Sequence, residues 1–263
     1  MGEEAPVAGV REELLEGQIA LVTLDFPPVN ALTPQAFLDI TATFDSYLAR
    51  PEVRACVLTA EGERAFCAGV DVRSRLPDGE TQTSPGAHYR RARETFNAIY
   101  ESAVPVIGAI NGPALGAGLA IAASCDYLVA STRASFGLPE IDVGLLGGAR
   151  HLQRLFPQGV TRRMHYTAER ATAEEAHRLG AVHAVVEPGE LLEAALAEAR
   201  VVASKMPAGI RLAKETLNQI EWMDLKAGYL YEQTRTEILQ GTEDAAEAKR
   251  AFLERRPPRF SGS

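Results

Sequence analysis

The segment NGPALGAGLAIAASCD, residues 111–126, brings three glycines and a proline directly before an apolar run that is typical of a helix. Gly112, Gly116 and Gly118 lack the spacing of the G-x-G-x-x-G dinucleotide fingerprint, and no G-K-[ST] ending marks a phosphate-binding loop. Such a turn allows close approach to the backbone N–H groups of a helix N-terminus, with the positive end of the helix dipole behind them. The segment predicts either a site for a small developing anion or a tight packing of helix on strand.

Strand-like and helix-like patterns alternate on both sides of this segment. The strand-like runs lie at 18–26, 53–60, 104–111 and 126–131, and the helical patterns at 33–50 and 87–102. Thr33 and Pro34 suit the N-cap and the first position of a helix. This alternation predicts right-handed β-helix-β units and a largely parallel sheet, so we expect an α/β fold.

The pattern changes after Pro188, because nearly every residue from Leu191 to Leu253 is helix-forming. We therefore expect an α/β core at residues 1–188 and a helical region at 189–263. The tail RRPPRFSGS is basic and is expected to be extended.

The composition excludes several classes of protein. The chain has 263 residues and a formal net charge of −8 with interspersed signs, which argues against a nucleic-acid partner. No apolar stretch approaches the ~20 residues of a membrane span, and the N-terminus lacks the pattern of a signal peptide. We expect a cytoplasmic protein with no membrane partner. Cys56, Cys67 and Cys125 lack metal-ligand spacing and predict buried free thiols.

A second small-residue turn, AFCAGVDVRSRL at 65–76, follows the strand-like run at 53–60. Open α/β sheets bind ligands at the ends of neighbouring parallel strands, so the two turns can converge on one site. The motifs AFCAGVD, VPVIGAINGPALGAGLAIAASCD and ASFGLPEIDVGLLGG together closely resemble the crotonase, or enoyl-CoA hydratase/isomerase, family. A further match at 167–187 and the helical end extend the resemblance over nearly the whole chain.

The resemblance implies a crotonase-like spiral core of repeated ββα/βαβ units and a C-terminal helical domain that assembles a homotrimer or a dimer of trimers. It implies an acyl-CoA thioester substrate, with no cofactor beyond the CoA of the substrate. No metal is expected, because His88, His165, His177 and His183 show no mutual metal-ligand spacing. In the family, two backbone N–H groups form an oxyanion hole for the thioester carbonyl, and by position these belong to Val70 and Ala117. Such donors matter because negative charge develops on that oxygen.

Hydratases of the family use two glutamates, and this chain matches only one of the two positions. The first position is Ala120 and the second is Glu140. One carboxylate suffices to take a proton from one carbon and return it to another, whereas hydration then needs another group to orient the water. Asp142 is a spare carboxylate that points to the same side as Glu140 if the segment is extended. The alternative is a surface or turn-capping aspartate.

Arg150 and His151 lie at 147–157, where the family places a turn and helix that line the acyl pocket. They are candidates to bind a polar acyl group, or to serve as an acid. The alternative places both on a solvent-facing helix edge.

The resemblance also implies where CoA binds. Residues around the AFCAG turn, among them Ala68 and Val70, would form the adenine slot, and Arg73 matches a basic residue that approaches the phosphates. Arg259 and Phe260 are candidates to reach the CoA of a neighbouring subunit, the alternative being a frayed tail.

The sequence thus predicts an enzyme in which Glu140 transfers a proton during hydration, dehydration or isomerisation of an enoyl-CoA. One alternative is an acyl-CoA C–C lyase or thioester hydrolase of the same family. Another is a non-catalytic acyl-CoA-binding homologue, against which the retention of Glu140 beside two intact turns argues.

Overall fold

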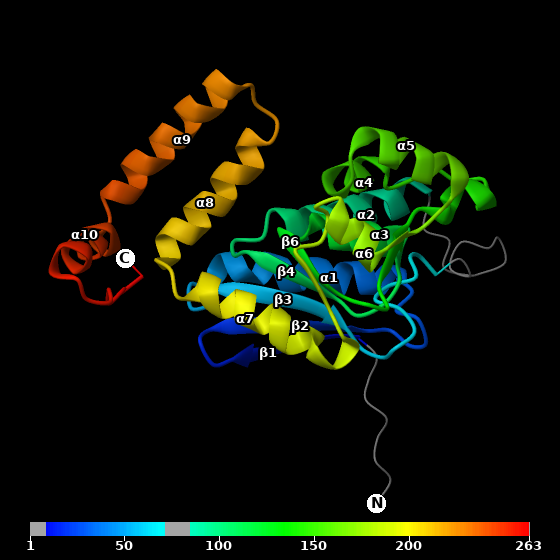
Figure 1. Cartoon of the computed structure of the whole chain (residues 1–263), viewed down its shortest axis with the longest axis horizontal. Helices are drawn as coiled ribbons and strands as arrows, with labels where there is room; N and C mark the ends of the chain where they lie inside the picture. Colours follow the sequence, from blue (N-terminus) through cyan, green and yellow to red (C-terminus); the bar gives the residue numbers. More distant parts are fainter. Residues whose placement is uncertain (1–8, 72–84, 263) are drawn as a thin grey trace, which may run out of the picture.

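Strands and helices alternate along the chain, and the computed structural model describes them over residues 9–71 and 85–262 (Figure 1). The strands are β1 (Gly9–Leu15), β2 (Ile19–Asp25), β3 (Ala55–Ala60), β4 (Val106–Ile110), β5 (Ala114–Leu115), β6 (Tyr127–Ser131), β7 (Ser135–Gly137), β8 (Ala171–Thr172) and β9 (Ala184–Val186). The α-helices are α1 (Pro34–Ser46), α2 (Pro85–Tyr100), α3 (Ala117–Ser124), α4 (Ala149–Leu155), α5 (Gln158–Thr167), α6 (Ala173–Arg178), α7 (Leu191–Ala203), α8 (Pro207–Ile220), α9 (Leu225–Gln240) and α10 (Glu243–Glu254).

The main sheet has the strand order β1-β2-β3-β4-β6-β9, and a smaller sheet has the order β5-β7-β8. In the main sheet only β1 runs antiparallel to its neighbour. The predicted α/β fold with a largely parallel sheet is therefore confirmed.

The edge strand β1 is an element that the sequence analysis does not predict. Its residues Arg11, Glu12 and Glu13 are exposed, so the segment lacks the apolar alternation of the other strands. It joins β2 through a tight turn in which Gly17 and Gln18 have φ angles of 80° and 63°. Charged side chains on an edge strand are a common protection against pairing with another chain.

Alternate residues of the central strands face two different helical layers. In β3, Cys56 and Leu58 pack with α1 and α2, whereas Ala55 and Val57 pack against α7. Helix α1 begins as predicted, because the Thr33 hydroxyl accepts a hydrogen bond from the Ala36 amide at 3.2 Å. The sheet thus holds α2 and α3 at one face, where the glycine segment lies.

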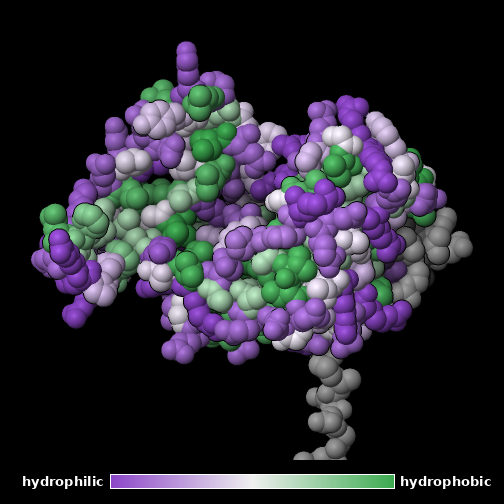
Figure 2. All heavy atoms as spheres, in the orientation of Figure 1, coloured by the Kyte–Doolittle hydropathy of each residue, from purple (hydrophilic) through white to green (hydrophobic). Residues whose placement is uncertain are grey.

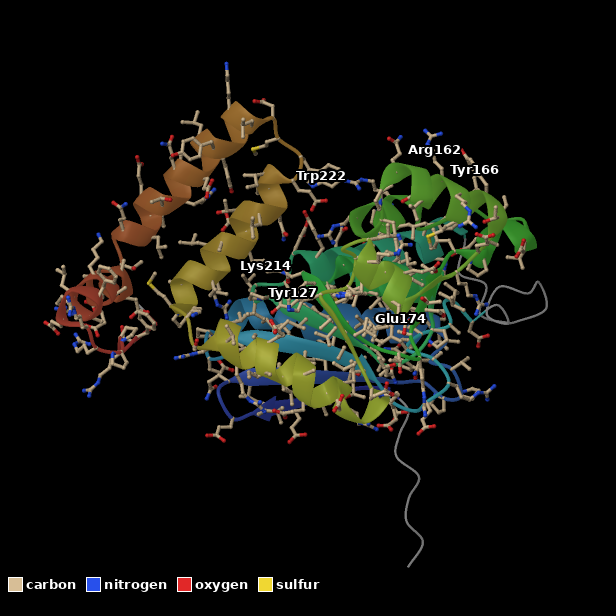
Figure 3. All side chains as sticks on the ribbon, viewed as in Figure 1. Tyr127, Arg162, Tyr166, Glu174, Lys214 and Trp222 are labelled. Atoms are coloured by element: carbon tan, nitrogen blue, oxygen red, sulfur yellow. The ribbon has the colours of Figure 1, made fainter. Side chains whose placement is uncertain are left out.

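The C-terminal helices divide into two groups. Helix α7 lies along the sheet as part of the core, whereas α8, α9 and α10 project from one end of it (Figure 1). Helix α8 is tied to the core by Lys214, whose buried Nζ lies 2.6 Å from Oδ2 of Asp126 (Figure 3). Arg211 donates further hydrogen bonds to the carbonyls of Arg50 and Val53. The chain therefore leaves the core after α7, beyond the predicted start of the helical region.

Over the described residues, no helix combines the length and the apolar character that crossing a membrane requires. The predicted cytoplasmic location stays a prediction.

Candidate active site

The turn after β3 leaves the amide of Val70 available. Leu32 donates from its amide to the Gly69 carbonyl at 2.8 Å and accepts from the Asp71 amide at 3.0 Å. In a parallel bridge the two residues that flank Val70 supply both bonds, so the N–H of Val70 itself points away from Leu32. In the described part of the chain this N–H donates to no other backbone carbonyl.

The glycine segment provides a second amide of this kind. Gly116 donates to the carbonyl of Gly137 at 3.0 Å, and Ala117 is the first residue of α3. The first N–H groups of a helix have no acceptor within the helix, so the Ala117 amide is available at the helix N-terminus.

The glycines bring these two turns together. A Cβ added to Gly118 would lie 2.1 Å from the carbonyl oxygen of Cys67, and one added to Gly69 would lie 3.6 Å from the nitrogen of Ala117. Only glycine allows helix α3 to pack this closely on the first turn. The glycines at the start of α3 therefore allow the two turns to pack against each other.

Glu140 lies beside the second turn. It comes from a short 3-10 helix, Pro139–Val143, and a Cβ added to Gly116 would lie 2.8 Å from its Oε1. Its Oε2 atom is shielded from solvent. A carboxylate is thus held next to the residue that precedes the Ala117 amide.

A cavity of about 280 Å³ joins these groups. Val70, Ala117, Ala120 and Glu140 line it together with His151. Among residues 9–71 and 85–262, the lining consists of Val70, His88, Tyr89, Ala92, Arg93, Phe96, Asn97, Gly116, Ala117, Ala120, Glu140, Leu145, Leu146, Gly147, Gly148 and His151. The structure therefore brings the two predicted amide donors and the predicted carboxylate to one pocket.

Two predicted pocket residues lie elsewhere. Asp142 is exposed and does not line the cavity, because its segment is a 3-10 helix and not the extended strand that would align it with Glu140. Arg150 is directed to the end of α8, where its guanidinium lies 3.6 Å from Glu221 and 4.4 Å from the ring centroid of Trp222 (Figure 3). Of the two possibilities for each residue, the positions agree with the alternatives: an exposed aspartate and an arginine at the solvent-facing edge of α4.

His151 does line the pocket and lies edge-on to Phe96, with 5.0 Å between the ring centroids. Burial, and then the nearby Arg154 and Arg150, lower the pKa of His151 to about 4. The imidazole is therefore neutral at pH 7 and is a poor general acid there. The neutral imidazole can donate one hydrogen bond from its N–H and accept one at its other nitrogen.

The predicted CoA contacts are only partly described. Ala68 is exposed beside the first turn, and its amide donates to the Val29 carbonyl at 3.0 Å. Arg73 lies outside the described residues. Arg259 is exposed and Phe260 half-buried in the tail after α10, which lies at the projecting end of the molecule and not at the pocket of its own chain (Figure 1).

One wall of the pocket comes from residues that the sequence analysis does not single out. Tyr89, Ala92, Arg93 and Phe96 of α2 face the cavity at spacings of three and four residues. This spacing is visible in the sequence as helical periodicity, but it does not identify which partner the face contacts. Within residues 9–71 and 85–262, no three His, Cys, Asp or Glu side chains gather as a metal site.

A family model described as enoyl-CoA hydratase/isomerase matches residues 15–263. The chain belongs to the enoyl-CoA hydratase/isomerase family. The predicted family, and with it the expectation of an acyl-CoA enzyme, are confirmed.

Individual members of the family are similar over nearly their full length. The chain is 41% identical over 240 residues to a (7aS)-7a-methyl-1,5-dioxo-2,3,5,6,7,7a-hexahydro-1H-indene-carboxyl-CoA hydrolase of Mycobacterium tuberculosis, covering 91% of this chain and 96% of the relative. It is 38% identical over 253 residues to an (E)-benzylidenesuccinyl-CoA hydratase of Thauera aromatica, covering 95% and 98%. A crystal structure of an enoyl-CoA hydratase from Bacillus anthracis matches with a TM-score of 0.91 at 31% identity, covering 97% of this chain and all 100% of the other. The crotonase-like fold is therefore confirmed.

Proposed function

We propose that this enoyl-CoA hydratase/isomerase family member forms a thioester enolate from an acyl-CoA. The amides of Val70 and Ala117 would form the oxyanion hole, and Glu140 would be the catalytic base and acid. The observation that carries the proposal is the contact between the Glu140 carboxylate and Gly116, the residue before the Ala117 amide. Base and donors therefore reach the same bound thioester.

The first step of isomerisation is proton removal from C2 of the acyl group. Glu140 takes the proton, and the electron pair of the C–H bond moves into the thioester, placing negative charge on the carbonyl oxygen. Two fixed N–H donors stabilise that charge, and loss of one such donor typically slows an enzyme by about 10²–10³-fold. Because the donors are backbone groups, the side chains of Val70 and Ala117 need only leave room for the substrate.

The second step returns a proton to carbon. For isomerisation of a 3-enoyl-CoA, protonated Glu140 delivers the proton to C4, and the double bond moves to C2–C3. Hydration of a 2-enoyl-CoA forms the enolate by addition instead. The oxygen of water adds to C3 as a proton of that water passes to Glu140, and protonated Glu140 then gives a proton to C2. Ala120 is buried and lines the pocket, so the described lining carries a single carboxylate. Isomerisation needs only one, and we therefore expect it to be faster than hydration.

A hydrolase is the second candidate, because the relative with 41% identity is named as one. In such a reaction the same oxyanion hole stabilises the enolate that leaves when a C–C bond is cleaved. Before that cleavage, water adds its OH group to the ketone carbon while Glu140 takes the proton of the water. Cleavage of the bond between that carbon and C2 then gives the carboxylic acid and the enolate, and the proton is delivered to C2. Glu140 would again handle the proton.

We propose that the projecting helices assemble the protein into a trimer or a dimer of trimers. Large apolar side chains on them are exposed, among them Leu225, Tyr229, Leu230 and Phe252. Figure 2 shows hydrophobic surface over this part of the molecule. In such an assembly Arg259 and Phe260 of one subunit would approach the CoA of the next, and Ala68 and Arg73 would contact the CoA of their own chain.

The test is to follow the ultraviolet absorbance of the conjugated enoyl thioester with a 2-enoyl-CoA in one cuvette and a 3-enoyl-CoA in another. Absorbance gained from the 3-enoyl-CoA identifies an isomerase, and absorbance lost from the 2-enoyl-CoA with a 3-hydroxyacyl product identifies a hydratase. Mass spectrometry of a ring ketone acyl-CoA detects the hydrolase by a mass gain of one water. Lack of all three activities would contradict the proposal.

A further inference from the structure

The far wall of the pocket is formed where α2 meets α4. Phe96 of α2 and His151 of α4 are in edge-to-face contact there, and this contact fixes the plane of the imidazole. The cavity of about 280 Å³ has room for roughly nine waters at their volume in the liquid. It is therefore large enough for an acyl group with a ring, and such a group would reach His151.

The imidazole of His151 is an uncharged polar group of this wall, as are the side chains of Tyr89 and Asn97 of α2. Its ring nitrogens make no hydrogen bond to another described residue, although its ring is half-buried. Neither ring nitrogen is among the fully buried polar atoms of the described residues, so both can be reached from the cavity that His151 lines. Because the neutral ring offers one N–H donor and one acceptor nitrogen, a ligand oxygen would satisfy it.

The neighbouring cations are turned away from this position. Arg150 pairs with Glu221, while Arg154 donates to the Ala123 carbonyl and lies 4.5 Å from the ring centroid of Tyr100. Both guanidinium groups are thus engaged outside the cavity, at the ends of α3, α2 and α8. Arg93 lines the cavity, but its side chain is exposed to solvent.

We propose that His151 is a specificity-determining residue that hydrogen-bonds an uncharged oxygen, a hydroxyl or a ketone, on the acyl group of the substrate. The inference rests on the proposed function, because the thioester held by Val70, Ala117 and Glu140 is what directs the acyl group towards His151.

The experiment measures binding by calorimetry in the Glu140→Gln background, which prevents turnover. The probes are cyclohexylacetyl-CoA, its ring ketones and ring alcohols with the oxygen at each ring position, and a ring carboxylate. The quantity compared is the affinity ratio of each substituted probe to the unsubstituted one within the same variant. Since one hydrogen bond contributes about 1 kcal/mol, we expect the favoured ketone or alcohol to bind about 5-fold tighter.

Further variants test whether the His151 side chain causes this affinity ratio. His151→Phe keeps a ring to pack on Phe96 and should bring the ratio to about 1, whereas His151→Asn keeps a neutral donor and acceptor and should retain part of it. His183→Phe is the matched control, because His183 lies outside the pocket with 57% of its side chain exposed. Thermal unfolding checks that each variant is folded.

Three results would overturn the proposal. The first is an affinity ratio near 1 for every ketone and alcohol probe in the parent protein, and the second is a ratio that His151→Phe leaves unchanged. The third is tightest binding of the carboxylate probe, which would assign specificity to a cation such as Arg93. If the unsubstituted probe does not bind at all, the proposed acyl-CoA function fails together with the inference, and this outcome is distinct from a flat ratio.

Discussion

Gly116 and Glu140 are in direct contact, because a Cβ on the glycine would lie 2.8 Å from Oε1 of the carboxylate. Gly116 also has a φ angle of 57°, which L-residues with a side chain rarely adopt. The same residue thus sets the entry into α3 and the position of the carboxylate.

Gly116→Ala should therefore affect both stability and activity. Backbone strain is expected to lower the free energy of unfolding by about 1–3 kcal/mol. The new methyl group would also displace Glu140, and we expect a loss of about 100-fold or more in kcat, in line with the cost of a small misplacement at a reacting centre. Urea unfolding and the enoyl-CoA absorbance assay measure the two effects.

Gly62→Ala is the matched control. Gly62 has a φ angle of 82°, but nothing lies within 4 Å of an added Cβ. This variant should lose stability by strain alone and keep its kcat. An equal loss of kcat in both variants would show that strain, and not the contact with Glu140, causes the effect.

Ala120→Glu should raise the hydration of a 2-enoyl-CoA. Ala120 is buried on the pocket side of α3, so a carboxylate introduced there would supply the second group that orients water. We expect a gain of about 10-fold or more in hydration rate, within the range of a general acid–base contribution. Ala120→Gln has the same size without the charge and should show no gain. A gain in both variants, or in neither, would mean that the substrate does not lie between residues 120 and 140.

Lys214→Met should destabilise the protein by about 1.5–3 kcal/mol, because it removes the buried cation that is hydrogen-bonded to Asp126. The loss is reduced to the extent that Asp126 stays hydrated, since its side chain is 26% exposed. Lys205→Met, at an exposed lysine, should change stability by less than about 0.5 kcal/mol. Urea unfolding monitored by circular dichroism compares the two variants. Equal effects would exclude the ion pair as the anchor of α8.

The three cysteines should be unreactive towards a disulfide reagent at pH 8. Cys56, Cys67 and Cys125 are free and buried, and burial raises the pKa of Cys67 and Cys125 to about 12. The thiolate, which is the reactive form, is therefore almost unpopulated in the folded protein. All three thiols should react after unfolding in urea. Rapid labelling of the native protein would show that one of them is accessible.

The sequence predicts the fold, and it names three residues that line the pocket, because both depend on local patterns. The Thr33-Pro34 helix start, the apolar central strands and the glycine turns are each specified by neighbouring residues. The proposed backbone donors at Val70 and Ala117 follow from motif position, and both residues line the pocket that Glu140 also lines.

Side-chain positions that depend on tertiary contacts cannot be predicted in the same way. Asp142 points to the same side as Glu140 only if the segment is extended, and the 3-10 helix turns it outward, in agreement with the alternative of a surface aspartate. Arg150 leaves the pocket because Glu221 and Trp222, about 70 residues further along the chain, offer an ion pair and an aromatic face. The α2 wall likewise becomes visible only when α2 packs beside α3. No local pattern specifies these three arrangements.

The central claim is that Glu140 exchanges the C2 proton of a bound acyl-CoA while the two amides hold the enolate. The most direct measurement is deuterium incorporation at C2 of a saturated acyl-CoA in D₂O, followed by NMR, because it needs no assumption about the final product. We predict exchange by the native protein, loss of about 10²–10⁴-fold in Glu140→Gln, and unchanged exchange in Asp142→Asn. Exchange that Glu140→Gln leaves intact would contradict the assignment of Glu140, and no exchange by the native protein would contradict the enolate itself.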